Sequence, residues 1–162
     1  MFYLELFRAL ERHRVRYVLV GGLAVTLHGV ERATMDIDLS VAMDAENLDA
    51  LLGLARELRF QPVLPVSLDA ITDPVLLERW RLERNMEVFA LRSPEQAGVT
   101  IDVLVRPAVR FEDMESRAAA FTVGDTSVRV ASIDDLIALK RAVGRPIDLS
   151  DIEHLERIRG IG

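Results

Sequence analysis

Two aspartates in the first quarter of the chain have the spacing of a metal-binding pair. Asp36 and Asp38 belong to the run Asp36–Val41, in which polar and apolar residues alternate. Such alternation predicts a strand, in which every second side chain lies on the same face. The two residues would then lie about 7 Å apart, since each residue of a strand advances the chain by about 3.3 Å. Carboxylates this close repel each other unless a cation or a proton lies between them, and oxygen ligands of this kind suit Mg²⁺ or Mn²⁺.

A third aspartate, Asp102, lies within the apolar run Val99–Val105. An unpaired carboxylate is costly to bury in such a strand, so Asp102 needs a partner, an exposed face or a metal ion. If this strand pairs beside Asp36–Val41, the three carboxylates face the same side and could hold two metal ions roughly 4 Å apart. That arrangement suits phosphoryl or nucleotidyl transfer. The structural alternative is a charge that protects an edge strand from aggregation.

Two further features would suit a bound phosphate group. Gly21 and Gly22 follow the apolar run Val15–Val20, and glycine lets backbone N–H groups come close to phosphate oxygens. Lys140 is the only lysine among twenty basic residues, and a lysine is a compact charge that suits a single phosphate oxygen. The alternatives are an ordinary turn at the glycines and a chance lysine in an arginine-rich chain.

The composition is that of an ordinary globular protein of 162 residues, with half of them apolar and 28% charged. We predict a single domain over 1–162, with a core over about 15–131 and C-terminal helices over about 132–159. The absence of cysteine excludes disulfides and thiolate metal ligands. The net charge of −6 argues against a long nucleic-acid interface. Since neither a signal peptide nor a membrane span is recognisable, we expect a cytoplasmic protein without a membrane partner.

The elements that must position these residues mix helices and strands. Apolar spacing and capping residues predict helices over 3–13, 23–28, 44–58, 110–119, 132–142 and 148–159, and a helical turn over 74–80. Alternation and turn residues predict strands over 15–20, 36–42, 85–91 and 99–105, and a small hairpin over 121–130. A polar Pro/Gly turn between 85–91 and 99–105 makes that pair an antiparallel hairpin. The prediction is an α/β fold, a mixed sheet flanked by helices with a helical C-terminus.

In their order along the chain, these motifs resemble the nucleotidyltransferase superfamily typified by DNA polymerase beta. That superfamily has a Gly-Gly or Gly-Ser pair after a strand, an acid-x-acid motif on the next strand and a third acid on a later one. Here these are Gly21-Gly22, Asp36-Ile37-Asp38 and Asp102. The segments 32–39, 139–141 and 145–151 are similar to small bacterial stand-alone members, which include the abortive-infection toxin enzymes of toxin–antitoxin pairs.

The resemblance implies that three aspartates hold the metal ions and carry catalysis: Asp36, Asp38 and Asp102. It implies that five residues bind the nucleoside triphosphate: Gly21, Gly22, Arg32, Thr34 and Lys140. Many members have serine at the second glycine position, where its hydroxyl helps to hold a phosphate, so here backbone N–H groups would have to replace it. For Arg32 an ion pair with Asp36 remains an equal alternative.

The reaction implied by the resemblance moves a nucleoside monophosphate from a nucleoside triphosphate, ATP among the candidates, to a hydroxyl acceptor and releases pyrophosphate. It would need Mg²⁺ or Mn²⁺. The acceptor stays open among an RNA 3′ end, a protein side chain and a small hydroxylated molecule, and a toxin would have a small partner protein. The alternative function is a non-catalytic nucleotide- or partner-binding module on the same fold.

Several other conspicuous residues are expected to be structural. We place Trp80 in the core. Asp148 and Asp151 are interpreted as the N-cap and a first-turn acid of the last helix.

Overall fold

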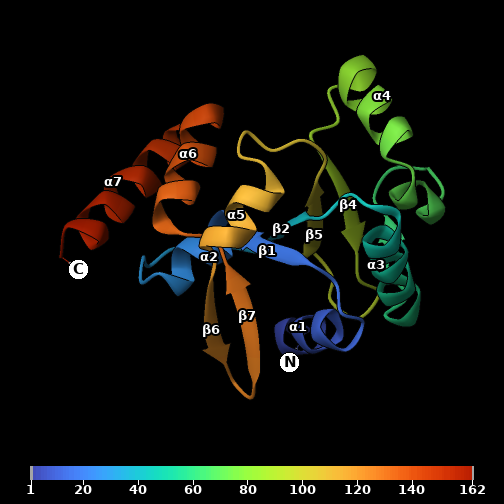
Figure 1. The fold of residues 1–162 in the computed structure, drawn as a ribbon, viewed down its shortest axis with the longest axis horizontal. Coiled ribbons are helices and arrows are strands. Elements are labelled where there is room, and N and C mark those ends of the chain that lie inside the picture. Colours follow the sequence, from blue (N-terminus) through green and yellow to red (C-terminus); the bar gives the residue numbers. More distant parts are fainter. Residues whose placement is uncertain (1, 162) are drawn as a thin grey trace.

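The computed structural model describes residues 2–161, and its centre is one seven-stranded mixed β-sheet (Figure 1). The strands are β1 (Tyr17–Val20), β2 (Ile37–Val41), β3 (Gln61–Pro62), β4 (Val88–Arg92), β5 (Thr100–Leu104), β6 (Ala119–Val123) and β7 (Thr126–Val130). They lie in the order β3-β4-β5-β2-β1-β7-β6. The pairs β2–β5 and β1–β7 are parallel, and the other neighbours are antiparallel.

Within the described residues 2–161, helices pack around this sheet. They are α1 (Phe2–Arg12), α2 (Gly21–Leu27), α3 (Ala45–Glu57), the 3-10 helix η1 (Leu68–Thr72), α4 (Pro74–Arg84), α5 (Phe111–Arg117), α6 (Ile133–Val143) and α7 (Pro146–Ile161). Helices α6 and α7 pack together at one end of the molecule, and α4 lies at the opposite end (Figure 1). The predicted mixed sheet flanked by helices, with a helical C-terminus, is confirmed. None of the described helices is both long and apolar enough to cross a lipid bilayer.

Strand β2 lies at the centre of the sheet because one of its faces is entirely apolar. Ile37 and Leu39 are fully buried, and burying side chains of this size stabilises a fold by about 1.5–3 kcal/mol each. The opposite face carries Asp38, which lies across from Val20 on β1 and from Asp102 on β5. A shift of the strand by one residue would force Asp38 into the core. Burial of the apolar face therefore also determines the face of the sheet on which the Asp38 carboxylate lies. The predicted pairing of the two aspartate strands is confirmed.

The structure corrects the limits of three predicted elements. Strand β2 begins at Ile37, so Asp36 lies just outside it on the exposed approach segment. Helix α2 begins directly at Gly21 and not two residues later. The helical turn predicted over 74–80 is the full helix α4, because the Asp73 side chain caps its first turn, Pro74 opens it and left-handed Asn85 ends it. Its apolar periodicity is weak, which is why the length was underestimated.

A buried asparagine joins the first two strands to α3. The Asn47 side chain accepts a hydrogen bond from the Arg16 N–H at 2.7 Å and donates to the carbonyl oxygens of Arg16 and Ala42 at 3.0 and 2.8 Å. These backbone groups flank β1 and β2, where the Arg16 carbonyl also accepts the Ala42 N–H at 3.3 Å. The asparagine therefore holds the outer ends of the two strands that carry the glycine pair and the central aspartate.

We predict that Asn47→Ala lowers the free energy of unfolding by about 3 kcal/mol, because three backbone hydrogen bonds lose their buried partner. Urea denaturation followed by circular dichroism measures the change. Asp49→Ala, an exposed position on the same helix, is the matched control and should stay within about 0.5 kcal/mol of the native chain. Equal stability of the two variants would contradict the role given to Asn47.

Candidate active site

A cavity of about 760 Å³ lies over the centre of the sheet, where the two aspartate strands meet. Its floor includes Asp38, Asp102 and Gly21. Its wall includes Lys140 and Arg145, contributed by the C-terminal helical segment. The volume is within the range of about 300–1,000 Å³ that small-ligand sites occupy. The cavity therefore joins the acidic pair, the glycine turn and two cationic side chains in one site.

The electrostatics of the floor are those of a negative charge without a counterion. Burial, together with the nearby carboxylates of Asp102 and Asp36, raises the pKa of Asp38 to about 7. Burial also raises the pKa of Asp102, although a hydrogen bond involving Thr100 opposes this shift. The Thr100 hydroxyl also donates to Asp36 Oδ1 at 2.9 Å. A bound cation would relieve the repulsion that produces these shifts.

The donors at the floor fit a divalent metal ion in their chemistry, since all of them are carboxylate oxygens. Among residues 2–161, no group of three acidic, histidine or cysteine side chains is already arranged to hold a metal ion. Asp36 is close enough to influence Asp38 and Asp102, but it does not line the cavity. A metal site built from all three aspartates therefore stays a prediction.

Gly21 is glycine because nothing larger fits beside Asp38. Its φ of +71° is in the left-handed region, where residues with a Cβ are strained. A Cβ at this position would lie 2.0 Å from Asp38 Oδ2 and 2.8 Å from Asp38 Cβ. Rotating the carboxylate would not remove the second clash. The backbone of the turn therefore contacts the central aspartate directly, a constraint that the sequence pattern did not reveal.

The space next to Gly22 is filled by the segment that leads into β2. A Cβ on Gly22 would lie 2.9 Å from Thr34 Oγ1 and 3.2 Å from Arg32 Cζ. Both contacts are tighter than ordinary packing, so a serine here would have to displace one of these side chains. The departure from the Gly-Ser pattern thus has a structural reason in this chain.

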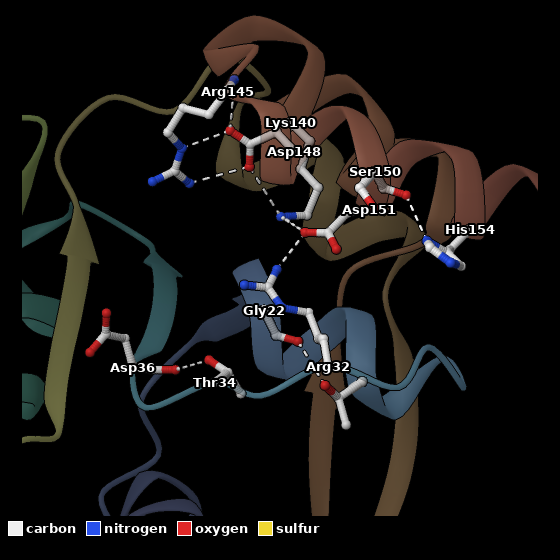
Figure 2. A network of polar contacts seen from close by, with 11 residues as sticks. Gly22, Arg32, Thr34, Asp36, Lys140, Arg145, Asp148, Ser150, Asp151 and His154 are labelled. Atoms are coloured by element: carbon white, nitrogen blue, oxygen red, sulfur yellow. Dashed lines mark hydrogen bonds and ion pairs between the residues drawn. The ribbon is translucent and has the colours of Figure 1, made fainter.

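Five charged residues in and behind the cavity wall form the ion cluster, made up of Arg32, Lys140, Arg145, Asp148 and Asp151 (Figure 2). Lys140 Nζ lies 3.0 Å from Asp151 Oδ2 and 3.4 Å from Asp148 Oδ1. Arg32 donates to Asp151, and Arg145 Nε donates to Asp148 at 2.8 Å. The cluster ties the segment before β2 to helices α6 and α7.

Two structural expectations change with this cluster. The expected alternative of an Arg32–Asp36 pair is wrong, because Arg32 binds Asp151 and the Asp36 carboxylate points away from it (Figure 2). The predicted N-cap role of Asp148 and first-turn role of Asp151 are wrong, because α7 already begins at Pro146; Asp148 is the first-turn acid and accepts the Arg145 N–H at 3.1 Å. Asp148 and Asp151 are also buried partners of cations from outside their own helix, a role that the sequence reading missed. The sequence pattern of a helix start hides such partners.

The ion cluster gives the cavity a basic side opposite its acidic floor. It contains three cations and two carboxylates, which leaves one positive charge in excess. Lys140 and Arg145 both lower the pKa of Asp38, which shows that their field reaches the floor. Lys140 is buried, whereas the Arg145 side chain is 66% exposed and lines the cavity. Arg145 was not among the predicted site residues, although its place in the tail segment 145–151 was a usable signal.

The structure divides the predicted site residues into two groups. Those that line the cavity are Gly21, Asp38, Asp102 and Lys140. Those that lie beside it are Gly22, Arg32, Thr34 and Asp36. The second group belongs to the approach segment before β2 and to the residue packed against it. Trp80, predicted as core, is partly buried and packs against the hydrophobic core.

Comparison with known proteins agrees with this geometry. The family model described as "Nucleotidyl transferase AbiEii toxin, Type IV TA system" matches residues 5–154. The chain belongs to the AbiEii nucleotidyl transferase toxin family. Nucleotidyl transfer is therefore the activity of this AbiEii-family chain, with its acceptor unidentified. A search of curated protein sequences found no match.

Solved structures share the fold of this AbiEii-family protein. A lincosamide antibiotic adenylyltransferase, LnuA with lincomycin bound, has a TM-score of 0.60 at 15% identity, with 97% of this chain and 94% of that one covered. ANT(2″)-Ia in complex with adenylyl-2″-tobramycin has a TM-score of 0.59 at 14% identity, with 99% and 94% covered. A putative nucleotidyltransferase from Thermotoga maritima has a TM-score of 0.54 at 15% identity, with 98% and 89% covered. At these identities the likeness concerns the fold.

We predict that Asp38→Asn stabilises the metal-free protein at pH 8. A carboxyl whose pKa is about 7 when folded and near 4 when unfolded binds its proton more tightly in the folded state. Stability is therefore lost as the pH rises from 4 to 7. The variant should gain up to about 4 kcal/mol at pH 8 in EDTA, or up to about 8–16 °C in Tm, and almost nothing at pH 4.

Thermal unfolding at both pH values measures this difference, with Asp49→Asn as the control at an exposed site. A variant that is less stable than the native chain at pH 8 would show that Asp38 is already neutralised by a partner in the folded protein.

We predict that Gly21→Ala destabilises the fold by more than about 2 kcal/mol, since it combines a left-handed backbone with a clash against Asp38. Gly160→Ala is the matched control, because no atom lies within 4 Å of a Cβ at that helical position. The control should be neutral or stabilising by up to about 1 kcal/mol. Chemical denaturation compares the two, and equal effects would contradict the proposed contact.

Proposed function

We propose that the cavity transfers a nucleoside monophosphate from a metal-bound nucleoside triphosphate to a hydroxyl group, with release of pyrophosphate. The observation that carries this proposal is the opposition of the Asp38–Asp102 floor and the cationic wall across one cavity. Such a site attracts metal ions to one side and phosphate oxygens to the other. ATP is one candidate donor.

Asp38 and Asp102 would hold the metal on the floor, and Asp36 would join them from the approach segment. Mg²⁺ fits these oxygen donors, and Mn²⁺ is the alternative. When bound, the metal supplies positive charge that stabilises the phosphates of the donor in the transition state. Gly21 keeps Asp38 in place through its direct backbone contact.

The triphosphate would lie toward the cationic wall. Arg145 presents an exposed guanidinium to the cavity while Asp148 fixes its position. Lys140 adds charge from below the surface, although it already shares two carboxylates. Backbone N–H groups at Gly21 and Gly22 would complete the phosphate contacts. In this proposal Arg32 and Thr34 contribute by shaping the segment beside the glycine turn.

The acceptor hydroxyl would approach from the Asp102 side. Its oxygen forms a bond to the α-phosphorus while the bond from that phosphorus to the pyrophosphate oxygen breaks. The hydroxyl proton passes to a base, a role that we give to Asp102. The relatives LnuA and ANT(2″)-Ia were solved with lincomycin and with adenylyl-2″-tobramycin. These ligands support a hydroxylated acceptor for the fold and leave the acceptor of this chain open.

The family description adds a biological setting to this chemistry. A type IV toxin implies an accompanying antitoxin, and we propose such a partner for this chain. We also propose a cytoplasmic location, where nucleoside triphosphates and Mg²⁺ are available.

We predict that metal-dependent nucleotide binding requires Asp38. Calorimetric titration with each of the four nucleoside triphosphates and Mg²⁺ should show binding by the native protein and a loss of at least about tenfold in affinity for Asp38→Asn. A tenfold loss corresponds to about 1.4 kcal/mol. Asp49→Asn is the control and should bind as the native chain does.

If the native protein binds no triphosphate with Mg²⁺ or Mn²⁺, the proposed donor site is wrong. Equal binding by the native chain and Asp38→Asn would favour a non-catalytic binding module instead.

A further inference from the structure

A second cavity of about 400 Å³ adjoins the catalytic one on the side of β4 and α4. Its walls are mainly apolar and include the Trp80 ring, Met86 and Leu64. Glu87 and Val88 line both cavities, so the two spaces meet at the first residues of β4. The position of α4 at the end of the molecule away from α6 and α7 is visible in Figure 1. The second cavity is therefore next to the site but far from its cationic wall.

The register of β4 and β5 brings this junction close to Asp102. Val88 lies opposite Leu104, and Ala90 lies opposite Asp102. In an antiparallel pair, residues directly opposite share a face, and diagonal neighbours on that face are about 7–8 Å apart. Val88 and Asp102 are such diagonal neighbours. A molecule in the second cavity that extends past Val88 thus arrives at the proposed base.

We propose that the second cavity binds the acceptor, and that the acceptor is a small hydroxylated molecule with an apolar, planar portion. This inference rests on the proposed function and adds to it the place and the chemical class of the second substrate. The donor lies against Lys140 and Arg145, and the acceptor lies against Trp80 and Met86. Its hydroxyl crosses the boundary at Val88 toward Asp102.

The walls favour this class of molecule over RNA. A volume of about 400 Å³ holds a compact ligand, and the half-buried Trp80 ring offers an apolar surface on which a planar group stacks. The Arg84 guanidinium already lies 5.9 Å from the Trp80 ring centre. Glu87 places a carboxylate at the junction, where the phosphates of an RNA end would have to pass. A neutral small molecule meets no such repulsion.

The tryptophan provides a direct readout, because Trp80 is the only tryptophan of the chain. The probe is the 4-nitrobenzyl ester of AMP. It resembles the product of the proposed reaction, because its phosphate ester bond joins a nucleotide to a planar alcohol. Its nitroaromatic group quenches indole fluorescence on contact. We expect it to quench Trp80 and to bind at least about tenfold more tightly than AMP, since it fills both cavities.

Two exposed leucines give a matched pair of variants. Leu64 lines the second cavity and is 52% exposed, whereas Leu82 is 67% exposed on α4 and does not line it. Leu64→Gln should reduce the difference in affinity between the ester and AMP to about twofold or less, and it should weaken the quenching of Trp80. The affinities for AMP and ATP should stay unchanged. Leu82→Gln should keep the full difference in affinity. Thermal melting confirms that both variants fold.

The outcomes separate this inference from the proposed function. Two outcomes would show that the acceptor site is wrong while the proposed function stands. In the first, ATP binds but the ester binds no more tightly than AMP. In the second, the ester keeps its higher affinity in Leu64→Gln. If neither ATP nor AMP binds, the proposed function fails. Quenching by a ten-nucleotide single-stranded RNA that depends on Leu64, without any advantage of the ester, would overturn the small-molecule class in favour of RNA.

Discussion

The half-buried carboxylate of Asp38 is the constraint on which the rest of the site depends. The apolar face of β2 fixes its direction, and the parallel neighbour β5 adds a second carboxylate, Asp102, at the same level. Two carboxylates this close together and partly withdrawn from water are unfavourable unless cations compensate for their charge. The absence of a side chain at Gly21 lets the backbone pack against Asp38 and keeps the carboxylate in this costly position. The Asp38 carboxylate thus lowers the stability of the fold at the position where the proposed chemistry needs negative charge.

The ion cluster provides the opposite charge without exposing most of it to solvent. Buried ion pairs add little net stability, because desolvation offsets much of their attraction. Their effect here is geometric. Arg32 and Asp151 are far apart in the sequence, and their contact fastens the segment before β2 to α7. Lys140 and Asp148 fasten α6 to α7. The ion pairs therefore fix how the segment before β2, α6 and α7 lie relative to one another at this side of the cavity.

The sequence was sufficient for the sheet, for the two aspartate strands and for the place of the glycine pair, since alternation and turn residues are local signals. Partners that are distant in sequence were not predictable from such signals. An acid near a helix start, such as Asp151, has the same sequence pattern whether or not it binds an arginine from another element. Trp80 was assigned to the core because a lone aromatic residue does not reveal which of its faces is covered. The contact between Gly21 and Asp38 required coordinates, because it depends on a backbone angle.

The parallel pairing of β2 with β5 has a consequence for when activity can arise. Asp38 and Asp102 are about sixty residues apart, and closing a loop of that length is slow and entropically costly. Strand β5 must also enter between β4 and β2. A chain still emerging from the ribosome therefore lacks the acidic pair until β5 has been made and inserted. For a toxin, the acidic pair therefore arises only after most of the sheet has been made, when much of the surface is also available to an antitoxin.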